Sequence, residues 1–249
     1  MKVAVISFSG NVGKTTIARH LLHPRMPGAK IISIESINAG EDEDHVIRGR
    51  QFAELQEYLQ VMDEVIVDIG ASNIEELLAM MRRYRGSHED FDVFIVPTVP
   101  AVKQQRDTMA TLAELSRLGV PAEKVRVVFN MVEDRSEIAQ AFSLVLSFLR
   151  QAPLAKLSLD AYLEMNEVYA RLNGTSIDLA SIASDTTDFK AAIVAASDMA
   201  ERTRLAQCLA TRRLAIGLLP ELDRCFAALA LNSDPSERAG VKVRTSVVS

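Results

Sequence analysis

Short, continuously apolar segments alternate along the first 150 residues with longer segments whose apolar residues recur every three or four positions. The apolar segments cover residues 3–8, 30–34, 64–68, 91–96 and 124–129. Continuous apolarity is typical of strands buried on both faces, as in parallel sheets. The intervening spacing predicts helices over 16–22, 50–59, 74–83, 101–118 and 136–149. This alternation predicts a three-layer α/β fold with a doubly wound, mostly parallel sheet.

The pattern changes in the last third of the chain. Residues 153–158 are the candidate for a sixth, weaker strand, and residues 160–231 are mostly helical in pattern. Apolar spacing over 188–217 predicts a helix that ends at Gly217, and Pro220 is expected to open another helix that runs to Leu231. These extra C-terminal helices are expected to pack on the sheet.

We therefore expect one domain over residues 1–231, followed by a flexible polar tail over 232–249. With 249 residues and 48% hydrophobic content, the chain can build a large core, so global disorder is excluded. The formal net charge of −5 gives no overall signal for nucleic acid.

Cysteine usage and the lengths of the apolar runs indicate the cellular compartment. The two cysteines, Cys208 and Cys225, form no CxxC pair, and two buried thiols are favoured over a disulfide. The first apolar run is too short for a signal peptide, and no uninterrupted apolar stretch of about 18 residues predicts a transmembrane segment. A cytoplasmic protein is the expectation.

The first apolar segment leads into the run Ser9-Gly10-Asn11-Val12-Gly13-Lys14-Thr15-Thr16. A strand, a glycine-containing loop ending in Gly-Lys-Thr and then a helix are typical of a P-loop, which binds nucleotide phosphates. Backbone N–H groups of such a loop point at phosphate oxygens, and the helix adds the positive end of its dipole. The glycines permit unusual torsions and close approach because they lack Cβ.

Each side chain at the end of this run has an expected partner. Lys14 is expected to contact the β- and γ-phosphates, Thr15 to ligate Mg²⁺ through its hydroxyl, and Thr16 to donate to the α-phosphate. The phosphate cradle would consist of Gly10, Asn11, Val12 and Gly13. It would contact only the phosphates, which ATP and GTP share, so it does not distinguish the two nucleotides.

The run departs from the common P-loop pattern, which has a glycine where this chain has Phe8. The variant pattern K-G-G-x-G-K-[ST] fits better. In that pattern Ser9 stands in place of the first lysine, and Asn11 in place of the second glycine.

Polar residues at the ends of three other apolar segments complete the candidate site. Ligands bind at the carboxyl ends of parallel strands, where Asp68, Glu35 and Asn130 lie. Asp68 is expected to hold Mg²⁺, with a helix N-cap as the alternative. Glu35 could orient the attacking water. Asn130 could meet an adenine edge or make ordinary turn contacts.

These segments together resemble the ParA/MinD class of P-loop ATPases. The resemblance covers about residues 1–180 and rests on residues 3–16, 65–68, 96–98, 128–132 and 172–177. More narrowly, residues 8–16, 35–38 and 68–73 look like the StbB plasmid-stability proteins. The resemblance implies ATP and Mg²⁺ as ligands, an ATP-dependent homodimer, and slow hydrolysis stimulated by a partner such as a plasmid DNA-binding adaptor protein.

Several functions remain open. The leading one is a nucleotide-dependent switch in plasmid stability, segregation, positioning or conjugative transfer, with loops 36–45 and 69–73 as moving parts. The class uses its first P-loop lysine across the dimer interface, and here Lys103 or Arg106 could replace it. The alternatives are a small-molecule kinase or ATP-dependent ligase, and a nucleotide-sensing adaptor without useful catalysis. Non-specific DNA contact is conceivable through Arg202, Arg204, Arg212 and Arg213, with ordinary helix-surface charge as the alternative.

Overall fold

The computed structural model describes residues 1–34, 44–172 and 177–231, and residues 44–50 only through their helical backbone. The candidate Glu35, most of the proposed moving loop 36–45 and the tail 232–249 lie outside the described residues.

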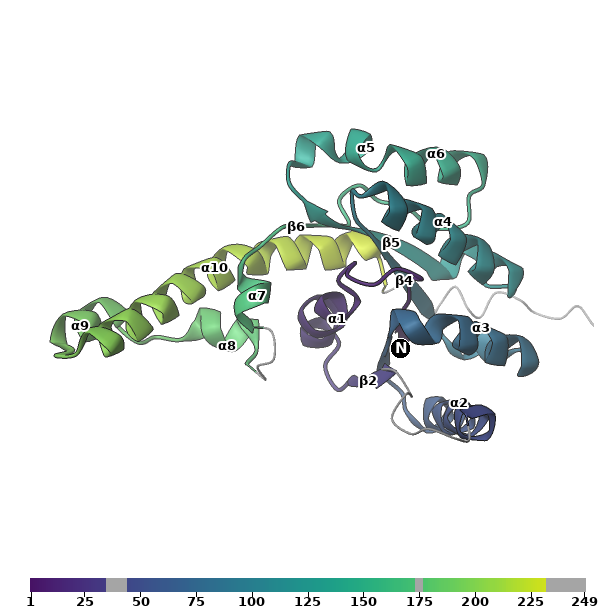
Figure 1. The fold of residues 1–249 in the computed structure, drawn as a ribbon, viewed down its shortest axis with the longest axis horizontal. Coiled ribbons are helices and arrows are strands. Elements are labelled where there is room, and N and C mark those ends of the chain that lie inside the picture. Colours follow the sequence, from purple (N-terminus) through teal and green to yellow (C-terminus); the bar gives the residue numbers. More distant parts are fainter. Residues whose placement is uncertain (35–43, 173–176, 232–249) are drawn as a thin grey trace, which may run out of the picture.

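Within the described residues, six parallel strands form one sheet at the centre of the molecule (Figure 1). The strand order is β2-β3-β1-β4-β5-β6. The strands are β1 (Lys2–Val5), β2 (Lys30–Ile34), β3 (Val65–Ile69), β4 (Val93–Thr98), β5 (Val125–Val132) and β6 (Tyr162–Glu164). The predicted α/β fold with a parallel, doubly wound sheet is therefore confirmed.

Helices cover both faces of the sheet. One face carries α2 (Asp44–Val61), α3 (Ile74–Arg83), α4 (Val102–Arg117), α5 (Ile138–Ala141) and α6 (Ser143–Gln151). The other face carries α1 (Lys14–Thr16) with its continuation η1 (Ile17–Leu22), α7 (Val168–Leu172), α8 (Leu179–Ser184) and α10 (Met199–Leu229). Short turns of helix, η2 (His23–Arg25), η3 (Ala71–Asn73), η4 (Ser87–Asp90), η5 (Ala122–Lys124) and η6 (Arg135–Glu137), join these elements.

Alternate residues of each central strand point to opposite faces. On β1, Ala4 packs in the cluster below α2 to α6, whereas Val3 and Val5 pack against η1 and α10. All three are fully buried. Burial of a valine side chain stabilises a fold by about 1.5–3 kcal/mol relative to leaving it exposed, which is why the central strands are apolar at every position.

The C-terminal helices differ from the prediction. Residues 188–217 do not form one helix: α9 (Phe189–Ala195) ends, and α10 begins after Asp198, whose carboxylate accepts the N–H groups of Ala200 and Glu201. The predicted break at Gly217 and the predicted helix start at Pro220 are both wrong, because α10 runs through them.

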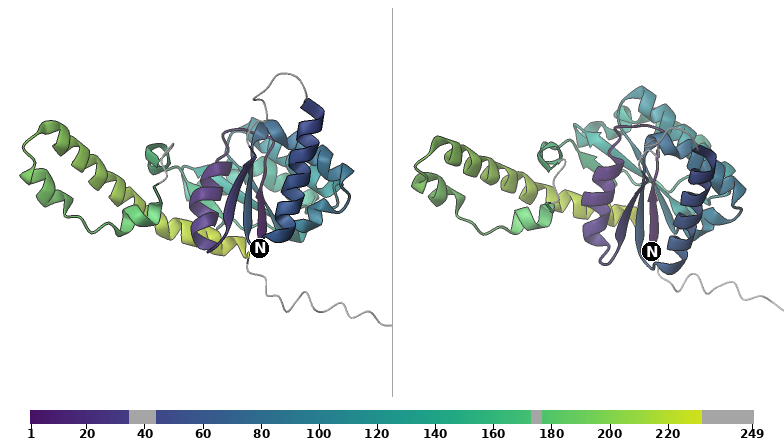
Figure 2. Two further views of the ribbon diagram at one scale, coloured as in Figure 1. Left: turned by 90° about the horizontal axis from the view of Figure 1, so that it is seen from below. Right: turned by 60° about the horizontal axis from the view of Figure 1, so that its bottom comes forward.

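Packing explains the continuity of α10. Leu218, Leu222, Cys225 and Leu229, spaced three or four apart, are buried against the sheet and η1. Gly217 and Pro220 lie on the exposed side. The lost backbone hydrogen bond at a helix-interior proline costs about 3 kcal/mol. Burial of the four side chains outweighs that cost. Figures 1 and 2 show the N-terminal part of α10 projecting beyond the sheet together with α9.

Two smaller expectations also need correction. The sixth strand is Tyr162–Glu164, not residues 153–158, which contribute a single bridge between Lys156 and Arg126. Tyr162 and Leu163 are nearly fully buried, so the strand that pairs with β5 is the short apolar segment after Asp160. The helix expected over 136–149 is interrupted at Phe142, which has non-helical torsions and a fully buried ring.

Candidate phosphate-binding site

The loop between β1 and α1 is a tight, strained turn. Asn11 and Gly13 both have positive φ angles, of 57° and 84°. A side chain at position 13 has no room, since a Cβ there would lie 2.1 Å from Asn130 Nδ2. Gly13 precedes the first turn of α1, whose N-terminus has no side-chain cap. The helix N-terminus therefore faces the loop as an anion site would require.

Lys14 lies folded over this loop. Its ammonium donates to the Ser9 carbonyl at 2.7 Å and lies 3.5 Å from the Ser7 carbonyl. The side chain is buried, and burial lowers the pKa of Lys14, while the Asp68 carboxylate opposes part of that shift. A cation is thus held at the loop in a partly desolvated position, where its interaction with an anion is strong.

The structure brings Thr15 and Asp68 together. The Thr15 hydroxyl donates to the Asp68 carboxylate at 2.7 Å. Asp68 lies on β3 opposite Val5 of β1, so the strand register places its carboxylate beside the start of the loop. Asp68 is 4% exposed and lies on the strand itself, which disfavours the helix N-cap alternative.

A hydroxyl and a carboxylate oxygen are ligands that Mg²⁺ accepts, and Mg²⁺ usually takes only one or two protein groups besides phosphates and water. Thr15 and Asp68 therefore fit this ion. In the described part of the chain, no group of three or more His, Cys, Asp or Glu side chains could hold a metal ion. A site shared with phosphates is consequently the arrangement that these residues favour.

Asn130 is also at the loop, in a contact that the sequence did not indicate. Its side-chain nitrogen donates to the Val12 carbonyl at 2.9 Å, and the residue is 4% exposed. The candidate residues Gly10 to Thr16, Asp68 and Asn130 thus lie around one loop at the carboxyl ends of β1, β3 and β5.

Helix α4 is a further support of the loop that the sequence did not reveal. The Ser9 hydroxyl donates to the Asp107 carboxylate. One turn further along α4, the Thr111 hydroxyl accepts the Phe8 N–H at 3.1 Å. Ser9, which replaces the lysine of the variant pattern, is therefore a structural anchor. Lys103 and Arg106 are exposed on the same helix.

The four candidate DNA-binding arginines lie on α10, and three of them have partners within the C-terminal helices. Arg204 donates twice to the Glu201 carboxylate, at 2.7 and 2.8 Å. Arg202 donates to the Ala196 carbonyl, and Arg212 donates to two carbonyls and stacks on Phe189. The Arg212 contacts hold the turn between α8 and α9 and join Phe189 of α9 to α10, and the Arg202 contact holds the turn between α9 and α10.

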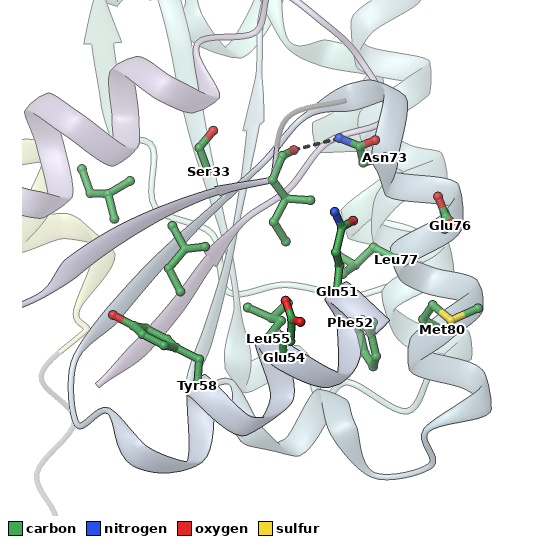
Figure 3. Close-up of a pocket in the computed structure, with 13 residues that line it drawn as sticks. Ser33, Gln51, Phe52, Glu54, Leu55, Tyr58, Asn73, Glu76, Leu77 and Met80 are labelled. Atoms are coloured by element: carbon green, nitrogen blue, oxygen red, sulfur yellow. Dashed lines mark hydrogen bonds between the residues drawn. The ribbon is translucent and has the colours of Figure 1, made fainter. Parts of the chain in front are cut away.

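A separate apolar cavity of about 480 Å³ lies between β2, α2 and α3 (Figure 3). At its upper edge the Asn73 amide donates to the Ile34 carbonyl at 2.9 Å. Its described lining carries Glu54 and Glu76 but no Lys or Arg. No residue of the phosphate loop lines the cavity, so the two are distinct. The described lining also holds no cationic side chain that could bind an acidic substrate.

Comparisons with known proteins give the fold. No family model and no curated protein matches the sequence. Among solved structures, apo McdA of Cyanothece matches over 84% of this chain and 98% of that chain, with 14% identity and a TM-score of 0.51. An ATP complex of an McdA variant covers 87% of this chain and 96% of that chain, with 14% identity and a TM-score of 0.47. The first likeness shows that this chain shares the McdA fold.

No helix in the described ranges is both long enough and apolar enough to cross a membrane.

Proposed function

We propose that this chain is a Mg²⁺-dependent ATPase of the ParA/MinD type that acts as a nucleotide-dependent switch. The observation that carries the proposal is the grouping of a buried Lys14, the Thr15–Asp68 pair and a positive-φ glycine loop at one helix N-terminus. The McdA fold agrees with it. The narrower role, in plasmid stability, segregation, positioning or conjugative transfer, rests on the resemblance to the StbB proteins.

Each residue has a defined part in the proposed reaction. Lys14 and the loop amides would neutralise charge on the phosphates while water attacks the γ-phosphate in line. Thr15 and Asp68 would hold Mg²⁺, which when bound neutralises phosphate charge. Thr16 would donate to the α-phosphate. Glu35, outside the described residues, would orient the water.

The proposed switch involves the segments that follow β2 and β3. The Gly70 backbone N–H and the Asn73 side-chain nitrogen both donate to the Ile34 carbonyl, each at 2.9 Å. The segment after Asp68 is therefore tied to the carboxyl end of β2. A displacement of Asp68 on nucleotide binding would be transmitted to residues 69–73 and onward to β2.

One experiment tests the proposal and separates it from the alternatives. Mg²⁺-ATP turnover and sedimentation are measured for the wild type, Lys14→Ala and the matched exposed-lysine control Lys190→Ala. We expect turnover and an ATP-dependent change of mass in the wild type and the control only. Repeating the assay with plasmid DNA and a DNA-binding partner tests stimulation.

Other outcomes identify the other functions. Phosphate transfer to a supplied metabolite, rather than to water, would indicate a kinase or ligase. Tight ATP binding without turnover, with or without partner, would indicate a nucleotide-sensing adaptor. The contact between Ser9 and Asp107 favours this second function, because the residue in place of the lysine of the class is uncharged and bonds to a carboxylate of its own chain. No binding of any nucleotide would overturn the proposal. Direct DNA binding through Arg213 and its neighbours should weaken steeply with salt.

A further inference from the structure

Strand β5 has an irregularity next to the phosphate loop. Phe129 pairs with Tyr162 and Val132 pairs with Glu164, so three steps along β5 oppose two along β6. The extra residue lies between Phe129 and Val132, at Asn130–Met131. Both flanking residues, Phe129 and Val132, pack in the cluster on the α4 side of the sheet, although an unbroken strand would place residues three apart on opposite faces. This is a β-bulge.

The backbone at the bulge is strained. Met131 has φ of 57°, a left-handed conformation that costs an unbranched, non-glycine residue on the order of 1 kcal/mol or more. Bulges and such torsions persist where surrounding contacts determine them, and they often redirect a side chain near a functional site. Val128 packs on the η1 and α10 side and Phe129 on the α4 side, so ordinary alternation turns Asn130 toward the side of α1, and the bulge ends this alternation directly after it.

Asn130 reaches the phosphate loop from the opposite side to α4. Its amide nitrogen donates to the Val12 carbonyl at 2.9 Å, across 118 residues of sequence. The same nitrogen fills the space that a Cβ at position 13 would need. Gly13 and Asn130 are thus fitted to one another: the glycine lets the amide approach, and the amide holds the peptide that precedes the glycine.

We infer that Asn130, the last residue of β5 before the bulge, is a positioning residue that latches the phosphate loop. This inference rests on the proposed nucleotide-binding function of the loop and adds a role within it. A latch acts on the cradle and so on every ligand that the cradle takes. It predicts that Asn130 contributes to binding of the phosphates whatever base they carry.

Binding titrations with three probes distinguish the latch from contact with adenine. ATP, GTP and inorganic tripolyphosphate are titrated, each with Mg²⁺, into wild type and Asn130→Ala. We expect affinity to fall by a similar factor for all three, about tenfold, as for loss of one buried hydrogen bond. A loss for ATP alone, with tripolyphosphate unaffected, would show that Asn130 reads the base and would overturn the latch. An unchanged affinity for all three would overturn it as well.

A second variant guards against simple unfolding. Asn130→Asp keeps the shape of the side chain but places a carboxylate oxygen against the Val12 carbonyl, so we expect a larger loss for the same three probes. The control is Asn166→Ala, which removes an amide whose oxygen accepts the Val168 N–H at 3.0 Å, away from the loop. It should leave all three affinities unchanged.

A ligand-free measurement separates this inference from the proposed function. Amide hydrogen exchange is compared in wild type and Asn130→Ala without nucleotide. The latch predicts faster exchange confined to residues 9–16. Unchanged exchange there would overturn it, even if ATP binds. If the wild type binds no triphosphate but exchange rises as expected, the latch stands as a structural contact and the nucleotide-binding proposal falls.

Discussion

The hydroxyl of Thr15 donates a hydrogen bond to the carboxylate of Asp68 across 2.7 Å, joining the first turn of α1 to the end of β3. The two residues are 53 positions apart in sequence, and adjacent strands β1 and β3 bring them together. Two oxygen ligands already in contact, with the carboxylate nearly buried, need little rearrangement to share a cation. Under the proposed function, this pair is therefore the place where nucleotide binding would depend on Mg²⁺.

Replacing Asp68 should uncouple nucleotide affinity from Mg²⁺. Asp68→Asn keeps the size of the side chain and removes the charge. We expect ATP affinity to fall about tenfold or more with Mg²⁺, since hydrogen bonds and contacts of charged groups contribute about 1.5–3 kcal/mol. With EDTA the loss should be much smaller. Asp63→Asn, at an exposed aspartate just before β3, is the control. An equal loss with and without Mg²⁺ would argue against the metal role.

As the pH rises, the affinity for phosphates should begin to fall earlier than it would if Lys14 had the pKa of an exposed lysine. Burial lowers the pKa of Lys14 from 10.5. Phosphate favours the ammonium form, so binding takes up a proton once the pH exceeds the lowered pKa, and affinity falls there. Titrations with tripolyphosphate from neutral pH upward measure this. Lys14→Arg, whose guanidinium stays charged, should show a flat profile over the same range. A parallel decline in both proteins would contradict the assignment.

The same shift has a stability consequence with a definite sign. Because the folded-state pKa of Lys14 lies below its unfolded value, the unfolded chain binds more protons between the two values. The contribution of Lys14 therefore becomes more favourable as the pH rises from the lowered pKa toward 10.5. Thermal unfolding of ligand-free wild type relative to Lys14→Met should shift in favour of the wild type over that range. A shift in the opposite direction, or a constant difference, would contradict the lowered pKa.

Much of the fold was predictable because local pattern and global packing agree in the first 150 residues. Strands such as Val65–Ile69 are buried at every position and have no helical spacing. The loop at Gly13-Lys14-Thr15 follows such a strand, so its place in the fold followed from the motif. The position of Asp68 beside the loop was predictable for the same reason, because its carboxylate ends the third apolar segment.

The supports of the loop were not predictable, because they depend on contacts distant in sequence. Asp107 and Thr111 lie on α4, and only the polar residues on the buried side of that helix, such as Gln105 and Thr108, hinted at a role beyond packing. The bulge directly after Asn130 appears only once β5 is paired with β6. Pro220 misled the prediction because local propensity was weighed without the packing of Leu218 and Leu222.

Removal of the contact between the loop and α4 should loosen the loop without unfolding the domain. Ser9→Ala and Asp107→Ala each delete one partner of the same hydrogen bond. We expect each to lower the unfolding free energy by about 1 kcal/mol, or roughly 2–4 °C in melting temperature for a chain of this size. The double variant should cost little more than either single one. Fully additive losses would show that the two residues act independently.

Two substitutions on the exposed side of α10 should stabilise the protein. Pro220→Ala restores a backbone N–H in the helix interior; the gain of about 3 kcal/mol is offset by about 1 kcal/mol from the freer unfolded chain, leaving about 2 kcal/mol. Gly217→Ala should add about 1 kcal/mol, because beyond the adjacent backbone of its own helix no atom lies within 4 Å of the new Cβ. Thermal unfolding measures both, and roughly 2–4 °C is expected per kcal/mol. If two separate helices met between these positions, the result would be the reverse. Alanine at 217 would remove a helix C-cap, and alanine at 220 would remove a favourable helix start. Both variants would then have a lower melting temperature than the wild type.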